Sequence, residues 1–342
     1  MKALNAVVYS AVLLFFANEA IACSDFQIKA KDGSVVIGRT MEFPVNLRSK
    51  IWSVPRSSQN KYAYLGIDAV GKSDLICDGM NEKGLSVEGL MFTDAKYQEP
   101  VQGKRSIPIT ELASYILGSF SSVEEVKKEF SNIRVTLKPI LELGGALGFH
   151  LAVHDANKNN LVVEFVDGDV KLYDNPLGVM TNRPEFDWHL TNLSNYMNLD
   201  PNDKKVLMMN GLKVNSLSVG NGLLGLPGDW TSPSRFIRLA WAVSSALPVK
   251  NSDEAVNLAS HIINSIDMPL GAIKEPFHLY GYAQWVVVKD LTNKVLYYRS
   301  YNNQTMKSID MKKLDLNAGA TPKKVSIEEG APKSFDVSGM ML

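Results

Sequence analysis

Cysteine is almost absent from this chain of 342 residues, which has only Cys23 and Cys77. A secreted protein that relies on disulfides for stability carries more cysteines, so we expect a large apolar core to stabilise this chain. Net charge is also lacking, because 36 Lys and Arg residues balance 36 Asp and Glu residues without a basic run. Nucleic acids and acidic membrane surfaces both attract basic patches, so neither is an expected partner.

Long hydrophobic runs are missing beyond the first 22 residues. Among the first 22 residues, positions 6–17 are almost wholly apolar and Lys2 is the only early charge. Ala20-Ile21-Ala22 has the A-x-A form of a signal cleavage site. The apolar run is too short to span a bilayer. We therefore expect residues 1–22 to be a secretory signal peptide. The mature chain, residues 23–342, is then periplasmic or secreted and has no integral membrane span.

The mature chain shows no repeat, low-complexity tract or linker, so residues 23–342 are expected to form one domain. Strands outnumber helices and the helices come in blocks, which favours an α+β sandwich over a doubly wound parallel sheet. The last 20 or so residues, from Thr321, are polar and are expected to be loosely held. Strands are predicted at 26–30, 34–39, 75–77, 85–90, 149–155, 161–166, 170–173, 283–289 and 294–301, and helices within 107–130 and at 233–246 and 252–266.

Metal-site templates are not matched. The chain has no C-x-x-C motif, and His150 and His154 lie four residues apart in a strand-like run with no Glu between them. The five His residues have no signature spacing with a Cys, so we interpret them as core or surface residues. We expect neither a metal nor an organic cofactor.

Cys23 is the residue that signal cleavage exposes as the new N-terminus. A thiol needs a base or a positive field to act as a nucleophile, and an α-amino group with a pKa of roughly 7.7–8.0 is such a base. Position alone leaves three interpretations open: a nucleophile, the lipid-attachment Cys of a lipoprotein, or a disulfide with Cys77. Ala20 stands where lipoprotein signals usually have a branched apolar residue, and lipidation would block both thiol and amine.

Four ordered motifs are similar to those of the choloylglycine hydrolase and penicillin V acylase family, which are N-terminal-nucleophile (Ntn) hydrolases of linear amide bonds. The resemblance spans residues 23 to about 315. It implies a four-layer αββα sandwich with antiparallel sheets, a small-molecule N-acyl amide substrate, no cofactor, and often a homotetramer. The motifs are Cys23 with 31–33 and 38–42, then 78–85, 175–182 and 226–236.

The resemblance also implies roles for individual residues. The positive charge of Arg39 would favour the thiolate of Cys23. Glu42 stands where well-known members have an Asp that contacts the α-amine. Asn182 matches the side-chain donor to the oxyanion, and Arg235 matches an Arg near the nucleophile.

Met91 matches the residue whose backbone N–H is the second oxyanion donor. Family members have Asn or Tyr at this position, which tracks their preference for bile salts or penicillins, so Met91 leaves the substrate open. We expect Met41, Phe43, Met91 and Phe92 to line an acyl pocket. Asp25, Asn81, Asn195 and Trp230 are interpreted as structural.

The sequence thus predicts a cysteine amidohydrolase in which Cys23 forms a thioester acyl-enzyme and its α-amine is the base. Expected substrates are N-acyl amides like penicillin V or conjugated bile salts. The alternatives are an acylase for N-acyl homoserine lactones or N-acyl amino acids and, in a different class, a lipid-anchored binding protein without catalysis.

Overall fold

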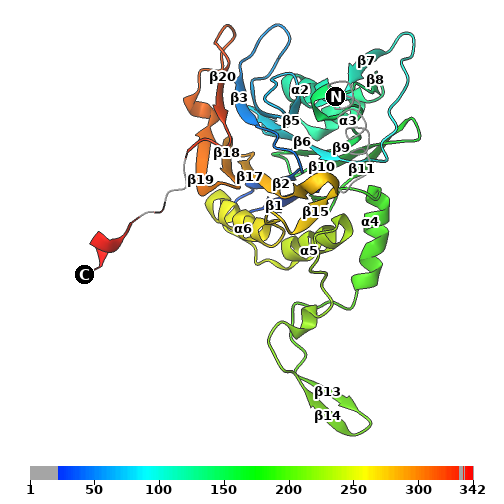
Figure 1. Ribbon diagram of the computed structural model, residues 1–342, viewed down its shortest axis with the longest axis vertical. Coiled ribbons are helices and arrows are strands. Elements are labelled where there is room, and N and C mark those ends of the chain that lie inside the picture. Colours follow the sequence, from blue (N-terminus) through cyan, green and yellow to red (C-terminus); the bar gives the residue numbers. More distant parts are fainter. Residues whose placement is uncertain (1–21, 331–333, 335, 342) are drawn as a thin grey trace, which may run out of the picture.

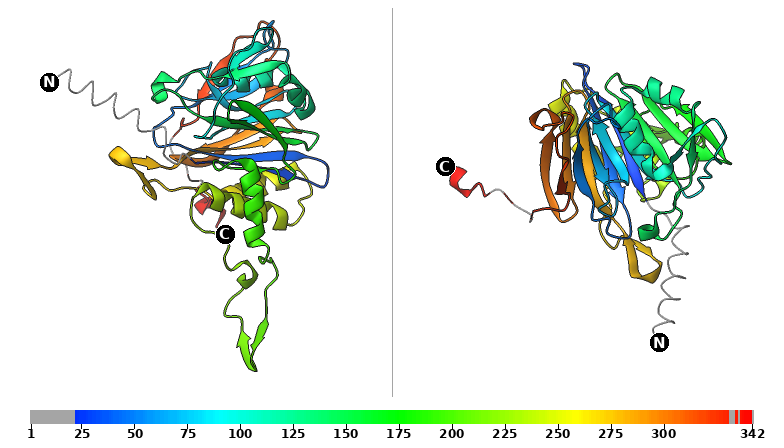
Figure 2. Two further views of the ribbon diagram at one scale, coloured as in Figure 1. Left: turned by 90° about the vertical axis from the view of Figure 1, so that its right-hand side faces the viewer. Right: turned by 90° about the horizontal axis from the view of Figure 1, so that it is seen from above.

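A computed structural model of the chain describes residues 22–330, 334 and 336–341. Two antiparallel sheets lie face to face, and helices cover their outer faces, which gives four layers in the order αββα (Figures 1 and 2). The predicted signal peptide lies outside the described residues except for Ala22. The expected α+β sandwich with antiparallel sheets is confirmed.

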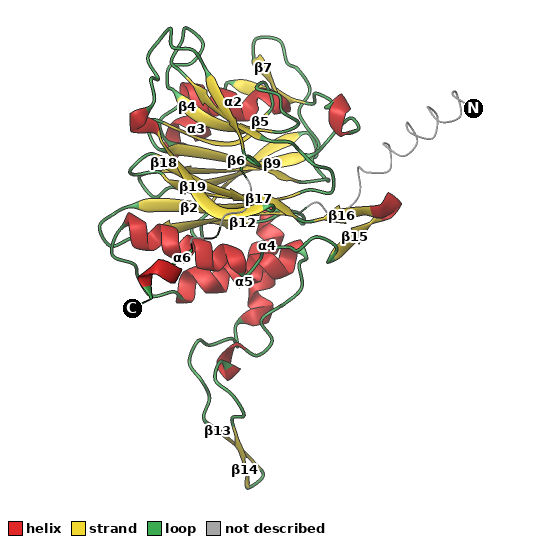
Figure 3. Ribbon diagram, turned by 60° about the vertical axis from the view of Figure 1, so that its left-hand side comes forward, coloured by secondary structure: helices red, strands yellow, loops and turns green. Residues whose placement is uncertain are grey.

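The first sheet has six strands in the order β12-β1-β2-β17-β18-β19. Its central strands are buried along almost their whole length, because one face meets the second sheet and the other meets α5 (Ser232–Ser245) and α6 (Ser252–Asn264), as Figure 3 shows. The strands are β1 (Cys23–Lys29), β2 (Val35–Glu42), β12 (Val179–Met180), β17 (Ala283–Asp290), β18 (Val295–Ser300) and β19 (Asn303–Asp310).

The second sheet has eight strands in the order β11-β10-β9-β6-β5-β4-β3-β20. Helices α2 (Ile109–Ser119) and α3 (Val123–Glu129) cover its outer face. The strands are β3 (Lys50–Val54), β4 (Tyr64–Asp68), β5 (Ile76–Asn81), β6 (Leu85–Met91), β9 (Phe149–Asp155), β10 (Asn160–Val166), β11 (Asp169–Asp174) and β20 (Lys323–Ser326).

Helix starts follow the capping residues that the sequence contains. The Ser122 hydroxyl accepts a hydrogen bond from Glu125 N–H, and the Asn251 side chain accepts one from Glu254 N–H. Each Glu carboxylate reaches one residue further back than a capping box requires, because it accepts from the residue before the cap, Ser121 or Lys250.

Two regions differ from the sequence expectation. The tail from Thr321 is not uniformly loose, because β20 pairs with β3 along four residues. A separate hairpin of β13 (Val206–Met209) and β14 (Leu212–Asn215) projects far from the body (Figure 1).

The remaining helices and strands are short and lie outside the two sheets. They are α4 (Phe186–Asn192), the parallel pair β7 (Arg105–Pro108) and β8 (Ile133–Thr136), and the hairpin β15 (Ile273–Glu275) and β16 (Leu279–Gly281).

Candidate active site

Cys23 is the first residue of β1 and is buried in the sandwich. It lies opposite Met41 in the β1–β2 ladder. The ladder continues one residue further back, because Glu42 N–H donates to the carbonyl oxygen of Ala22 at 3.0 Å. The start of the predicted mature chain is therefore held in a central strand, with its backbone direction fixed by pairing to β2.

Arg39, on β2, reaches the Cys23 thiol. Its Nη2 lies 3.9 Å from Sγ and also donates to the carbonyl of Gly89 at 2.6 Å. Its Nη1 donates to the carbonyl of Cys77 and to Asp78 Oδ2, at 2.9 and 2.7 Å. The guanidinium is thus fixed on three sides while one edge faces the sulfur.

Burial and the neighbouring charges shift the pKa of the Cys23 thiol in opposite directions. Burial raises the pKa of Cys23, Arg39 lowers it, and the carboxyl of Glu42 raises it, with a net rise. Burial is the largest single effect on the pKa of Arg39 and lowers it, but Asp78 and the two cysteines together raise the pKa above its ordinary value, so this guanidinium stays charged. Arg39 is therefore the group that favours the thiolate against the cost of burial.

Asn182 follows β12 and has a hydrogen bond at every polar atom. Its Oδ1 accepts from Cys23 N at 2.7 Å and from Arg235 Nη2 at 2.9 Å, and its Nδ2 donates to the Met91 carbonyl at 2.9 Å. Its backbone N–H donates to Ser232 Oγ, and its carbonyl faces Nε2 of the buried His189 at 2.8 Å. An amide Nδ2 has two hydrogens, so one remains for a ligand beside Cys23.

Arg235, in the first turn of α5, spans the nucleophile and Asn182. Its Nη1 donates to the Cys23 carbonyl at 2.6 Å and to the Ser24 hydroxyl, and its Nε donates to the Trp230 carbonyl. Burial lowers the pKa of this guanidinium, and the nearby Glu42 opposes that effect. Arg235 therefore fixes the backbone of Cys23.

Glu42 is the last residue of β2 and is buried without a hydrogen-bond donor. Neither carboxylate oxygen is paired with a described residue. Burial raises the pKa of this carboxyl to about 7, although Arg235 opposes the rise. A buried carboxylate without donors is costly, so this position favours an additional positive group.

A small apolar pocket with a volume of about 30 Å³ adjoins Cys23. Met41, Phe43 and Met91 line it, whereas Phe92 is buried elsewhere and stacks on His150. Cys77 also lines it, and both cysteines are free thiols. The other lining residues are Leu47, Ala69, Leu75, Gly89, Ile140, Leu143 and Phe149.

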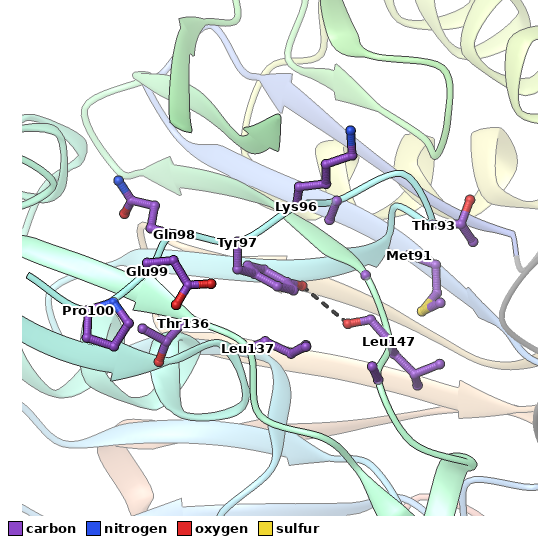
Figure 4. A pocket seen from close by; sticks show the side chains of 13 residues that line it. Met91, Thr93, Lys96, Tyr97, Gln98, Glu99, Pro100, Thr136, Leu137 and Leu147 are labelled. Atoms are coloured by element: carbon purple, nitrogen blue, oxygen red, sulfur yellow. Dashed lines mark hydrogen bonds between the residues drawn. The ribbon is translucent and has the colours of Figure 1, made fainter. Parts of the chain in front are cut away.

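A larger groove of about 650 Å³ also includes Met91 in its lining (Figure 4). Its wall is more polar, with Lys96, Gln98 and Glu99, and the Tyr97 hydroxyl at its floor contacts the Leu147 carbonyl at 3.3 Å. Met91, at the end of β6, therefore lines both the groove and the Cys23 pocket.

The structure brings Cys23, Arg39, Asn182, Arg235 and the Met91 carbonyl into one connected site. Residues that hold these groups were missed from the sequence: Ser232 and His189 on Asn182, and Lys289 on Asp78. Lys289 had a detectable signal, because it follows the apolar run Val286-Val287-Val288 in a strand where a charge is unexpected.

Comparisons with known proteins agree with this geometry. Residues 23–324 match the family model of linear amide C–N hydrolases, choloylglycine hydrolase family. The chain is 32% identical to a bile salt hydrolase/transferase of Clostridium perfringens, over 86% of this chain and 94% of that protein.

Solved structures show the same fold. A crystal structure of a mutant conjugated bile acid hydrolase from Clostridium perfringens matches with a TM-score of 0.84 and 31% identity, over 92% of this chain and 99% of the other. Penicillin V acylase from Agrobacterium tumefaciens matches in fold, with a TM-score of 0.73 and 23% identity, over 90% and 92% of the two chains.

The fold is that of the Ntn hydrolases. The chain belongs to the choloylglycine hydrolase family of linear amide C–N hydrolases, as its motifs indicated, and is an amidohydrolase of that type. Among the described residues, no helix is long and apolar enough to cross a membrane.

Proposed function

We propose that the protein hydrolyses an N-acyl amide with Cys23 as its N-terminal nucleophile. The observation that carries this proposal is the position of Cys23: it begins β1, its nitrogen contacts Asn182, and its thiol faces Arg39. The free α-amine would arise when residues 1–22 are removed from an exported chain. Its charged form would then supply the positive group that the buried Glu42 carboxylate lacks.

The reaction has two stages. The sulfur of Cys23 attacks the amide carbonyl carbon, and the thiol proton passes to the α-amine and then to the leaving nitrogen as the C–N bond breaks. The second hydrogen of Asn182 Nδ2 and the backbone N–H of Met91 stabilise the oxyanion. Water, with the same amine as base, then releases the acid and restores the thiol.

The proposed substrates are penicillin V-like or bile-salt-like amides, which are the substrates that the relatives' names describe. One observation favours the second candidate, an acylase for N-acyl homoserine lactones or N-acyl amino acids. The pocket beside Cys23 is small, about 30 Å³, and is lined mainly by apolar side chains, which favours a flexible acyl chain over a bulky steroid.

The decisive experiment measures amine release by the mature protein from penicillin V, glycine- and taurine-conjugated bile acids, and N-acyl homoserine lactones. We expect one class to be hydrolysed and the Cys23→Ala variant to be inactive but folded. Adding one residue before Cys23 should be nearly as damaging, because it converts the amine to an amide. Turnover by Cys23→Ala would overturn the mechanism.

We also propose that the protein forms a homo-oligomer through the β13–β14 hairpin. Leu207, Met209 and Leu212 are 57%, 57% and 66% exposed on it. The two strands form a sheet of their own that projects from the body (Figure 2). Clustered exposed apolar side chains of this kind mark interaction surfaces.

A further inference from the structure

Six ionisable residues meet between the two sheets, close to Cys23, and all are buried. The first sheet supplies one from each of three adjacent strands, and so does the second. We call them the buried charge layer: Asp25 on β1, Arg39 on β2 and Lys289 on β17, facing Asp78 on β5, Glu88 on β6 and His154 on β9.

The contacts of this layer form a continuous chain. Asp78 accepts from Arg39 at 2.7 Å and from Lys289 at 2.9 and 3.1 Å. Lys289 also contacts Glu88, whose other oxygen is 3.6 Å from His154 Nε2. His154 Nε2 lies 2.7 Å from Asp25 Oδ2, two residues along β1 from Cys23.

The layer pairs cationic groups with carboxyl groups. Burial lowers the pKa of His154, but Asp25 and Glu88 raise it to about 9, so the ring is charged at neutral pH. Burial lowers the pKa of Lys289, and Asp78 and Glu88 raise it above its ordinary value. Burial raises the pKa of Glu88 to about 7, although Lys289 and His154 oppose the rise. Each cation of the layer thus contacts at least one carboxyl group, and buried charges are tolerated when they are paired in this way.

Asp25, Glu88 and His154 also hold three ligand atoms within 4.8 Å of one another, a spacing that suits a metal ion. However, Lys289 contacts Glu88, and His154 is already hydrogen-bonded to Asp25. A cation placed there would meet an existing positive charge. These three side chains are therefore better suited to hold a proton on His154 than to bind a metal ion.

The effect on the site follows from Asp78, which is held from two sides. Arg39 binds Asp78 through one hydrogen bond, to Oδ2, while Lys289 donates to both carboxylate oxygens and so fixes the orientation of the carboxylate. Without Lys289, the carboxylate is free to turn and bind Arg39 through two bonds, which is the preferred geometry of this pair. The guanidinium would then turn away from the thiol, since Asp78 would compete with the Gly89 carbonyl for Nη2.

We propose that Lys289 and Asp78 are positioning residues that hold Arg39 against the thiol of Cys23, with Glu88 holding Lys289 in place. The inference rests on the proposed function, since it assumes that Cys23 is the nucleophile. It adds to that function two residues that do not themselves touch the reacting atoms.

The test measures iodoacetamide alkylation of Cys23 against pH in the mature protein, read from the N-terminal peptide by mass spectrometry. Arg39→Met should raise the pH midpoint of alkylation by roughly 1–3 pH units, because the thiolate loses a nearby opposite charge. Lys289→Met should raise the same midpoint by at least about half a pH unit, because Arg39 remains but is held less firmly. It should also lower kcat for whichever substrate is hydrolysed and leave KM within about twofold.

The double variant separates positioning from direct electrostatics. If Lys289 acts through Arg39, Lys289→Met adds no further shift in the Arg39→Met background. An equal shift in both backgrounds would overturn the proposal, and so would an unchanged midpoint with a lower melting temperature. If Lys289→Met does not fold, Lys289→Gln, which keeps a hydrogen-bond donor, is judged by the same criteria.

Asp155→Asn is the matched control. Asp155 is a buried carboxylate on β9 that binds the Val123, Asn157 and Asn159 N–H groups and lies outside the layer. Its loss should lower stability without moving the midpoint. The two proposals fail in different ways. Turnover by the Cys23→Ala variant would overturn the proposed function. An unmoved alkylation midpoint together with an inactive Cys23→Ala variant would overturn only the positioning role of Lys289.

Discussion

Asn182 illustrates how much one side chain depends on its neighbours. Its Oδ1 is occupied by Cys23 and Arg235, and one Nδ2 hydrogen is occupied by Met91. Only the remaining hydrogen can meet a reacting carbonyl, so the direction of that hydrogen is fixed by the other contacts. In the proposed mechanism this donor needs no rearrangement during the reaction, and oxyanion stabilisation is strongest when its donors are already in place.

Asn182→Ala should therefore lower kcat by about 10²–10³-fold with little change in KM, because the donor acts mainly in the transition state. Steady-state kinetics on the hydrolysed substrate measures this. Asn195→Ala is the control, since Asn195 is exposed and bonds only to Asn192 among the described contacts. A loss confined to KM would instead assign Asn182 to substrate binding.

His189 gives a prediction for stability against pH. Burial lowers its pKa to about 4, against an ordinary value of 6.5, while its bond to the Asn182 carbonyl opposes the shift. The unfolded chain takes up this proton at higher pH than the folded chain does. Stability should therefore fall between pH 6.5 and 4, by about 3 kcal/mol from this residue.

Urea unfolding at several pH values tests this expectation. His189→Gln can still donate to Asn182 and does not titrate, so the acid-dependent loss should shrink. His261→Gln, at an exposed residue of α6, is the matched control. Equal slopes in all three proteins would contradict the assignment to His189.

At the scale of elements, the β13–β14 hairpin is separable from the catalytic fold. Its turn residues Asn210 and Gly211 both have positive φ, as the tight two-residue hairpin turn requires, so the hairpin forms by its own local chemistry. Its exposed apolar side chains do not contribute to the sandwich core. Changes there should affect association and not folding.

Replacing Leu207, Met209 and Leu212 together by Ser should convert the proposed oligomer to monomers in light scattering, with an unchanged melting temperature. Met197→Ser is the control, because Met197 is exposed and lies outside the hairpin. A wild-type protein that is already monomeric at micromolar concentration would refute the proposed assembly surface.

At the scale of the whole molecule, the sequence was informative where periodicity and turns are local. The strands around Asp32-Gly33 and the helices after Ser122 and Asn251 have signals in neighbouring residues, and the structure confirms them. The family motifs also predicted the four layers correctly.

The sequence did not reveal what depends on contacts between distant strands. The ion pair of Lys289 with Asp78 joins residues 211 positions apart. The β3–β20 pairing likewise joins Ser53 to Lys323, 270 positions apart, and the polar residues of β20 gave no sign of it. Such contacts become visible only when the sheets are assembled.

Processing is the remaining prediction at this scale. When the full-length gene is expressed in a bacterial host, we expect the exported protein to begin at Cys23 and to carry no modification. Intact mass spectrometry gives the answer, with an Ala22→Asp variant, which should block cleavage, as the control. A mass increased by acyl chains would favour the lipid anchor, and retention of residues 1–22 would remove the free amine.

The strand ladder that continues through Ala22 has a practical consequence for producing this protein. A gene that starts at Cys23 yields an initiator methionine at the position of Ala22, where the residue is only 6% exposed and its carbonyl is paired with Glu42. The backbone of a retained methionine can complete the same ladder, yet the Cys23 nitrogen of that chain is an amide. A preparation that is homogeneous by size and melting temperature then contains active and inactive molecules, and its specific activity reports the extent of methionine removal.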